Sequence, residues 1–323
     1  MKKYIIIGLV AIGSLLPMTG CNNIQTQNTN KKEIISTDSN NFVESKESIE
    51  INKKEIIEEL TSDKYEGRLV GSKGNKLAEE YLYLKFEELN LKPVLNNNLY
   101  HKYEQEVSDT YGVVDENNKT RIESVNNVVG KIEGKNNKNA IVVSAHFDHI
   151  GKQNGEIIRG AVDNASGVAV LLDLALRLKD KNLESDIIFC AFNGEEKGLS
   201  GSQKFVEDIK KEYENIININ IDSVGYKNGG DIIFLQQKNY EKIYSLMKES
   251  LNLNDIKVNK YGKLKGVSDN KNFERNGIPN ICLIDENVKE VIHSVKDTED
   301  KVDYRKLDNL VNSVNYFIKN YKF

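Results

Sequence analysis

The chain has 323 residues, of which 45 are basic and 49 acidic, and its formal net charge is −4. With 39% apolar residues, its composition is that of an ordinary globular protein. The lack of a basic excess argues against a nucleic-acid partner. The length is large for one domain but fits a single α/β enzyme.

The first residues have the pattern of a secretory signal. Two lysines precede an apolar run over residues 4–16, and small residues follow before Cys21. The apolar run is short for a membrane span. The sequence MTGC at 18–21 resembles the lipobox of bacterial lipoproteins, with Met18 where that motif usually has Leu. The resemblance implies cleavage before Cys21 and a lipid on Cys21; an ordinary cleaved signal or an uncleaved anchor is the alternative.

Three segments are therefore expected: a lipoprotein signal peptide at 1–20, a disordered tether at 21–49 and a folded domain at 50–323. The tether is rich in Asn, Gln, Ser, Thr and Lys and has few large apolar residues, which is typical of an unfolded linker. The expected location is outside the cell, anchored by lipid on the outer face of a bacterial membrane.

The folded domain begins with two predicted helices, at 48–63 and 73–91, where apolar residues recur at helical spacing. In the second helix Leu77, Tyr81 and Leu84 are expected on the buried face. Extended runs follow at 104–114, 126–134 and 140–147. Thereafter helices are predicted at 165–180, 200–211, 240–251 and 305–321, and strands at 185–192, 216–222, 230–236 and 278–284. This alternation predicts an α/β fold, a single-domain α/β/α sandwich with a central mixed, largely parallel sheet.

Imidazole and carboxylate side chains follow several of these strands where they end, or stand just before a helix. They are His146, Asp148, Asp163, Glu195, Glu196, Asp222 and His293. One such residue alone is usually a solvated surface group. Because ligands bind beyond the carboxyl ends of strands in α/β sheets, their recurrence predicts a metal site at that edge. On an extended chain His146 and Asp148 share a side, and His149 is expected to point away and not to bind metal.

The order His-x-Asp, Gly-Ala-x-Asp-Asn-Ala-Ser-Gly, Glu-Glu, Asp and His resembles that of the co-catalytic zinc exopeptidases. It looks closest to the bacterial leucyl aminopeptidases and aminopeptidase Y. The resemblance runs from about Leu60 to the C-terminus and includes the segments 65–93 and 268–279. It implies that residues 50–323 are a zinc exopeptidase catalytic domain of the phosphorylase/hydrolase-like type. It also implies two zinc ions, with cobalt or manganese as substitutes.

The resemblance gives each site residue a role. The metal ligands would be His146 and Asp222 for one zinc, Glu196 and His293 for the other, and Asp163 for both. Glu195 would be the general base, and Asp148 would orient His146. Imidazole and carboxylate ligands without thiolates suit a catalytic site rather than a closed structural one. The implied substrates are peptides with a free N-terminus, cleaved by an activated water.

The chain departs from the family pattern at three positions. Asn270 stands where the family has His in its Ser-Asp-His segment, and Ile292 stands where some relatives have a Tyr that assists the oxyanion. Tyr226 and Tyr261 are the candidates for a replacement donor. Val162 stands where relatives often have Asp, which is not expected to affect ligation.

Three other functions remain open within this fold. A glutaminyl cyclase would use one zinc and tryptophan walls, and this chain has no Trp. A carboxypeptidase would need a cation for the substrate carboxylate, for which Arg68, Arg159 and Arg275 are available. A peptide-binding lipoprotein would be expected to have lost ligands or the base, and this chain keeps all of them.

Overall fold

The computed structural model describes residues 50–112, 119–235, 240–259 and 266–323. The predicted signal peptide, the lipidation of Cys21, the tether and Tyr261 lie outside these residues. Within them, no helix is both long enough and apolar enough to cross a membrane.

A seven-stranded sheet forms the centre, with the strands in the order β1-β2-β6-β3-β7-β9-β8. The strands are β1 (Tyr100–Val107), β2 (Arg121–Ile132), β3 (Asn136–His146), β6 (Ser185–Phe192), β7 (Asn215–Ile221), β8 (Ile232–Phe234) and β9 (Asn280–Asp285). The adjacent strands β6, β3, β7 and β9 are parallel, whereas β1, β2 and β8 pair antiparallel with their neighbours. A separate short hairpin, β4 (Lys152–Gln153) and β5 (Glu156–Ile157), follows β3. The predicted mixed, largely parallel sheet is confirmed.

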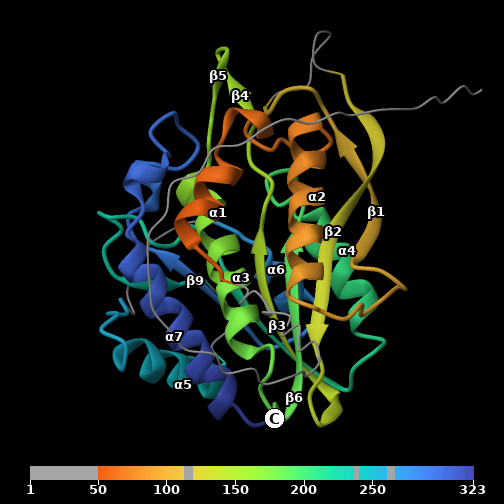
Figure 1. Cartoon of the computed structure of the whole chain (residues 1–323), viewed down its shortest axis with the longest axis vertical. Coiled ribbons are helices and arrows are strands. Elements are labelled where there is room, and N and C mark those ends of the chain that lie inside the picture. The colour runs from red at the N-terminus through yellow and green to blue at the C-terminus, as the bar shows by residue number, and fades with distance from the viewer. Residues whose placement is uncertain (1–49, 113–118, 236–239, 260–265) are drawn as a thin grey trace, which may run out of the picture. The chain divides into compact units, whose positions relative to one another are not determined.

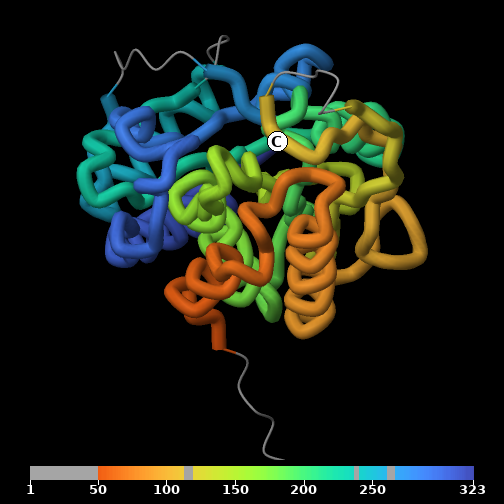
Figure 2. Tube along the Cα trace, turned by 90° about the horizontal axis from the view of Figure 1, so that it is seen from above, coloured from red at the N-terminus to blue at the C-terminus, as the bar shows by residue number. Residues whose placement is uncertain are grey.

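Helices cover both faces of this sheet (Figure 1). They are α1 (Lys53–Leu60), α2 (Lys73–Glu88), α3 (Ser166–Leu178), α4 (Ser200–Ile209), α5 (Glu241–Asn252), α6 (Asn270–Arg275) and α7 (Tyr304–Asn320). The core on one face includes α1, α2, α3, α5 and α7, and the core on the other includes α4 and α6. Figure 2 shows α1, α2 and α3, coloured red to green, together on one side.

Strand β3 illustrates why the sheet is buried on both sides. Ile141 and Val143 belong to the core on one face, and Ala140 and Val142 belong to the core on the other. Successive side chains of a strand point to opposite faces, so a continuous apolar run fits a strand covered by helices on both sides.

The buried face of α2 agrees only in part with the predicted one, since Leu77 and Tyr81 are partly buried against the core. Ala78, Leu82 and Phe86 are fully buried, whereas Leu84 is 57% exposed. The fully buried stripe recurs every four residues and includes the small Ala78, so of the three predicted residues only Leu84 was placed wrongly.

Candidate metal centre

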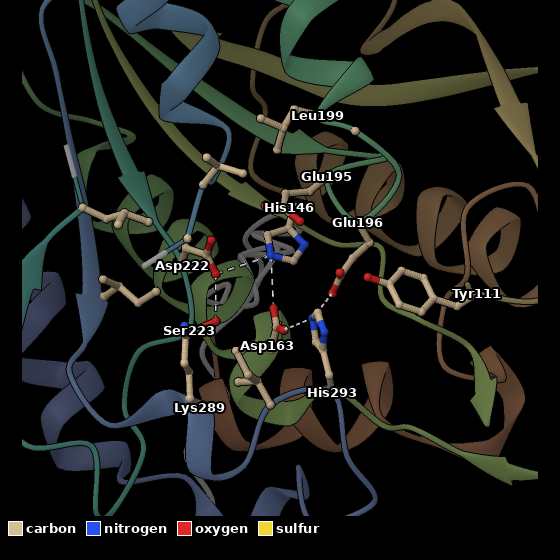
Figure 3. A pocket seen from close by; sticks show the side chains of 16 residues that line it. Tyr111, His146, Asp163, Glu195, Glu196, Leu199, Asp222, Ser223, Lys289 and His293 are labelled. Carbon is tan, nitrogen blue, oxygen red and sulfur yellow. Dashed lines mark hydrogen bonds and ion pairs between the residues drawn. The ribbon is translucent and has the colours of Figure 1, made fainter. Parts of the chain in front are cut away.

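The carboxyl ends of three neighbouring strands carry much of the predicted site. His146 is the last residue of β3, Asp222 follows β7 directly, and Glu195 and Glu196 lie in the loop after β6. Because β6, β3 and β7 are adjacent and parallel, these residues meet at one edge of the sheet. Asp163, just before α3, and the loop residue His293 complete the set (Figure 3).

Asp163 stands between two groups of side chains. Its Oδ1 is 3.2 Å from His146 Nε2, and its Oδ2 is 3.1 Å from His293 Nε2. In Figure 3 the Asp163 carboxylate lies between the two imidazoles. One carboxylate with each oxygen directed at a different donor group is the arrangement that a bridging ligand requires.

The first of these groups, called here the His146 group, consists of His146, Glu195 and Asp222. One donor atom from each lies within 4.8 Å of the others. His146 Nε2 is 3.4 Å from Asp222 Oδ1, which also accepts a 2.8 Å hydrogen bond from Ser223 Oγ.

The second group, called here the His293 group, consists of His149, Asp163, Glu196 and His293. Glu196 Oε1 is 3.0 Å from His293 Nε2 and 3.1 Å from His149 Nδ1. The prediction that His149 points away is wrong. The chain turns after His146, and the main chain of His149 pairs with Arg68 and Leu69, so strand alternation does not extend to His149.

The two adjacent glutamates have different environments. The Glu195 carboxylate makes no hydrogen bond to any described residue, and burial raises its pKa well above the usual value. Burial also acts on Glu196, but its hydrogen bonds with His149 and His293 hold the pKa of that carboxyl below its usual value. Neighbouring carboxylates whose pKa values are moved apart in this way are typical of a site in which one takes part in proton transfer and the other stays ionised.

Asp148 connects His146 to the glutamate loop. Its carboxylate oxygens accept hydrogen bonds from the backbone N–H groups of Glu195 (3.1 Å) and Glu196 (3.2 Å). His146 Nδ1 lies 3.2 Å from the Asp148 carbonyl oxygen and 3.7 Å from Oδ1. The nearer contact of the imidazole is therefore the main chain of Asp148, and the carboxylate fixes the Glu195–Glu196 backbone.

Two further residues, which the sequence analysis did not select, position the backbone at Asp163 and at Asp222. Asp297 is fully buried and accepts hydrogen bonds from Val162 N (2.6 Å) and Asp163 N (3.1 Å). The Asn164 side-chain amide donates to the Ile221 carbonyl, and its Oδ1 accepts a hydrogen bond from the Ser223 N–H. These two bonds fix the backbone on either side of Asp222. Asn164 lies inside the motif next to Asp163, whereas no motif singled out Asp297.

The site opens into a pocket of about 350 Å³. Its apolar lining includes Leu199, Leu235, Val267, Ile284 and Ile292, and its other lining includes Tyr111, Ser223 and Lys289. Among the described residues that line it, Lys289 is the only lysine or arginine. The pocket is therefore mostly apolar beyond the cluster of histidines and carboxylates.

Tyr111 supplies a phenol at this pocket that the sequence analysis missed. Its hydroxyl points towards Glu196 in Figure 3, and its ring centroid is 5.9 Å from that of His293. Burial and the nearby carboxylates raise the pKa of Tyr111 to about 12, so its O–H donor persists at neutral pH. Tyr226 does not line the pocket, and its hydroxyl faces Glu290 at 3.5 Å, so its selection as replacement donor is wrong.

Asn270, at the position of the family His, also lies away from the pocket lining. Its amide donates to the Leu235 carbonyl at 2.9 Å and to Asn280 Oδ1 at 3.0 Å. These bonds connect α6 to β9 and to the segment after β8, so Asn270 has a structural setting here.

The donor atoms fit divalent metal ions. In the His293 group, neighbouring donor atoms of different residues lie 3.0, 3.1, 3.1 and 3.9 Å apart. Zinc binds nitrogen and oxygen at about 2.0–2.1 Å, so tetrahedral ligands lie roughly 3.3 Å from one another. Buried imidazoles and carboxylates at this spacing match a zinc site in both chemistry and size.

The amino-acid sequence of the chain is similar to those of known proteins. The model for peptidase family M28 matches residues 127–318, which is more than half of the chain and includes every residue of both donor groups. Aminopeptidase YwaD of Bacillus subtilis is 36% identical over 103 residues, covering 31% of this chain and 22% of that protein. The match thus spans well under two thirds of the relative.

Solved structures share the fold over most of the chain. A glutaminyl cyclase of Fimbriiglobus ruber superposes with a TM-score of 0.68 at 18% identity, covering 85% of this chain and 97% of that one. BSAP, a zinc aminopeptidase from Bacillus subtilis, superposes with a TM-score of 0.65 at 17% identity, covering 84% and 95%. At these identities the similarity establishes the α/β fold and does not choose between the two activities.

Proposed function

Because the chain belongs to peptidase family M28, we propose that it is a zinc-dependent aminopeptidase. It removes N-terminal residues from peptides that have a free N-terminus. The observation that carries this proposal is the Asp163 carboxylate, whose two oxygens face His146 and His293 separately. Such a bridge supports a pair of zinc ions, with cobalt or manganese as substitutes.

The proposed ligands are His146 and Asp222 for one ion, Glu196 and His293 for the other, and Asp163 for both. When bound, the ions polarise the scissile carbonyl and lower the pKa of water. Glu195 Oε accepts a proton from the attacking water and returns it to the leaving amine as the C–N bond breaks. Asp148 holds Glu195 in place through the backbone. Tyr111 is positioned to donate its O–H to the oxygen that gains negative charge.

The apolar lining of the pocket indicates the preferred substrates. Leu199, Leu235 and Ile292 border the space beside the site, so an aliphatic or aromatic N-terminal side chain is buried more favourably than a charged one. This preference is part of the proposal.

The alternative activities have less support. A cyclase would use one zinc and tryptophan walls, whereas two donor groups are present and the chain has no Trp. For a carboxypeptidase, Arg68 is fully buried and bonded to carbonyl oxygens, and neither Arg159 nor Arg275 lines the pocket. Among the described lining residues, Lys289 is the one lysine or arginine that could pair with a substrate carboxylate. For a peptide-binding protein, the intact donor groups and the free Glu195 carboxylate have no evident purpose.

The test combines metal analysis with paired substrates. We expect the purified protein to contain close to two zinc ions per chain and to cleave leucine p-nitroanilide. We also expect o-phenanthroline to abolish this cleavage and N-acetylation of the substrate to prevent it. Equal cleavage of the acetylated substrate would contradict an aminopeptidase, and cyclisation of an N-terminal Gln peptide without hydrolysis would favour the cyclase.

We also propose that a lipid on Cys21 anchors the protein on the outer face of a bacterial membrane. The support is the sequence pattern of residues 1–21 alone. In cells expressing the full chain, Cys21→Ser is expected to prevent incorporation of labelled palmitate and to move the protein out of the detergent-extracted membrane fraction. Unchanged labelling of the variant would rule the anchor out.

A further inference from the structure

We infer that His149 is a further metal ligand, so that the His293 group binds its ion with two imidazoles. This inference rests on the proposed function, since it requires that metal is bound at this site. It adds one residue to the five ligands that the family resemblance implies.

The placement of His149 is fixed by the main chain. The residue is fully buried, its N–H donates to the Arg68 carbonyl at 3.2 Å, and it pairs with Leu69 as an isolated bridge. Its side chain therefore has little freedom to turn elsewhere.

The contacts of this imidazole with carboxylates within 4 Å are made by Nδ1. Nδ1 is 3.1 Å from Glu196 Oε1 and 3.9 Å from Asp163 Oδ2, and the ring centroid is 5.7 Å from that of His293. Nε2 is buried and has no hydrogen-bond partner within the described parts of the chain. Nδ1 of His149 therefore faces the same two carboxylate oxygens, Glu196 Oε1 and Asp163 Oδ2, that His293 Nε2 faces, which is the placement expected of a second imidazole on the same ion.

The geometry of the four donors supports ligation. His149 Nδ1, Asp163 Oδ2, Glu196 Oε1 and His293 Nε2 lie within 4.8 Å of one another. Three of their separations are 3.0–3.1 Å and the fourth is 3.9 Å, on either side of the roughly 3.3 Å expected between tetrahedral zinc ligands. His149 thus fills a fourth position at this ion, which leaves water and substrate to a fifth position there or to the ion of the His146 group.

With His149 as a ligand, the two donor groups differ in metal preference. The His293 group would offer two imidazoles, whereas the His146 group offers one imidazole beside carboxylates. Imidazole suits zinc better than manganese, and carboxylate suits manganese. The two positions would therefore differ in affinity, with the first equivalent of zinc bound at the His293 group.

The competing role for His149 is a hydrogen bond from Nδ1–H that merely orients Glu196. His149→Asn separates the two roles, because the Asn side-chain amide can donate from nearly the position of Nδ1 but is a much poorer zinc ligand. Loss of a residue that only orients a ligand costs about 10–100-fold in metal affinity, and retention of the hydrogen bond should reduce even that loss.

The experiment measures binding of Zn²⁺ to the full-length protein by competition with a chromophoric chelator. We expect His149→Asn to weaken the tighter site by more than about 100-fold while the other site changes little. The matched control is His101→Asn. His101 is also buried, but its ring contacts Asp208 and Asn127 away from the site, so zinc affinity should be unchanged.

A second measurement does not depend on a variant that folds. In Co²⁺-loaded wild-type protein with ¹⁵N-labelled histidine, metal-bound imidazoles give strongly shifted N–H signals. Three such signals require His149 as a ligand, because the other bound histidines are only His146 and His293. Two bound Co²⁺ with only two shifted rings, or wild-type zinc affinity in His149→Asn, would overturn the inference and leave the proposed function intact. No bound metal at all would overturn the proposed function itself.

Discussion

Glu195→Gln is expected to retain both metal ions and to lower kcat by about 10²–10⁴-fold, the range for loss of a general base. Glutamine has the shape of glutamate, and the backbone hydrogen bond from residue 195 to Asp148 does not involve the side chain. The amide cannot take up the proton of the attacking water. Elemental analysis and steady-state kinetics on the same sample provide the measurement.

The matched control is Glu196→Gln, the same chemical change one residue along the chain. Glu196 contacts His149 and His293 directly, so this variant is expected to lose metal as well as activity. The assignment of the base would be wrong if Glu195→Gln kept wild-type kcat with full metal content. Loss of metal in both variants alike would instead make Glu195 a ligand.

The sequence was sufficient to predict the sheet and the convergence of the main site residues. Apolar strands buried on both faces are recognisable locally, and the parallel arrangement of β6, β3 and β7 brings their carboxyl ends together. His146, Glu196 and Asp222 therefore meet because of topology, which a strand pattern predicts. Their catalytic roles came from the family resemblance and remain proposals.

The remaining features depend on loop conformation, which a strand pattern does not contain. His149 lies three residues beyond the end of β3, where strand alternation no longer applies, so its direction was predicted wrongly. Asp297 is distant in sequence from Asp163, and only the folded chain shows that it caps the Asp163 backbone. Tyr111 reaches the pocket from the segment after β1, where its sequence suggested an extended strand.

Arg68→Met is expected to lower the free energy of unfolding by more than about 3 kcal/mol, because it leaves several buried carbonyl oxygens without a donor. The Arg68 side chain is fully buried, and burial lowers its pKa to about 10. Its guanidinium donates to four main-chain oxygens, those of Leu60, Phe147, Arg159 and Gly160. Methionine fills similar space but has no N–H group. Urea unfolding of the metal-free protein measures the change.

Arg159→Met is the control for removing an arginine from the same region. Arg159 is about one-third exposed, donates to the Thr61 carbonyl and pairs with the exposed Asp63. Its loss is expected to cost about 1 kcal/mol, since one hydrogen bond and a solvated ion pair are removed. Equal destabilisation by the two substitutions would show that the buried bonds of Arg68 have no special importance.

The zinc affinity of Arg68→Met shows whether Arg68 only stabilises the fold or also positions the metal ligands. The Phe147 carbonyl lies between His146 and Asp148, and the Gly160 carbonyl opens the segment that carries Asp163, so one guanidinium joins two ligand-bearing loops. Ions that bind only the folded state stabilise it in proportion to the logarithm of their concentration over Kd. If Arg68 supplies stability alone, the folded Arg68→Met variant binds zinc with wild-type Kd. If it sets the distance between His146 and Asp163, zinc binding is weaker even under conditions where the variant is fully folded, and this second result is the one we expect.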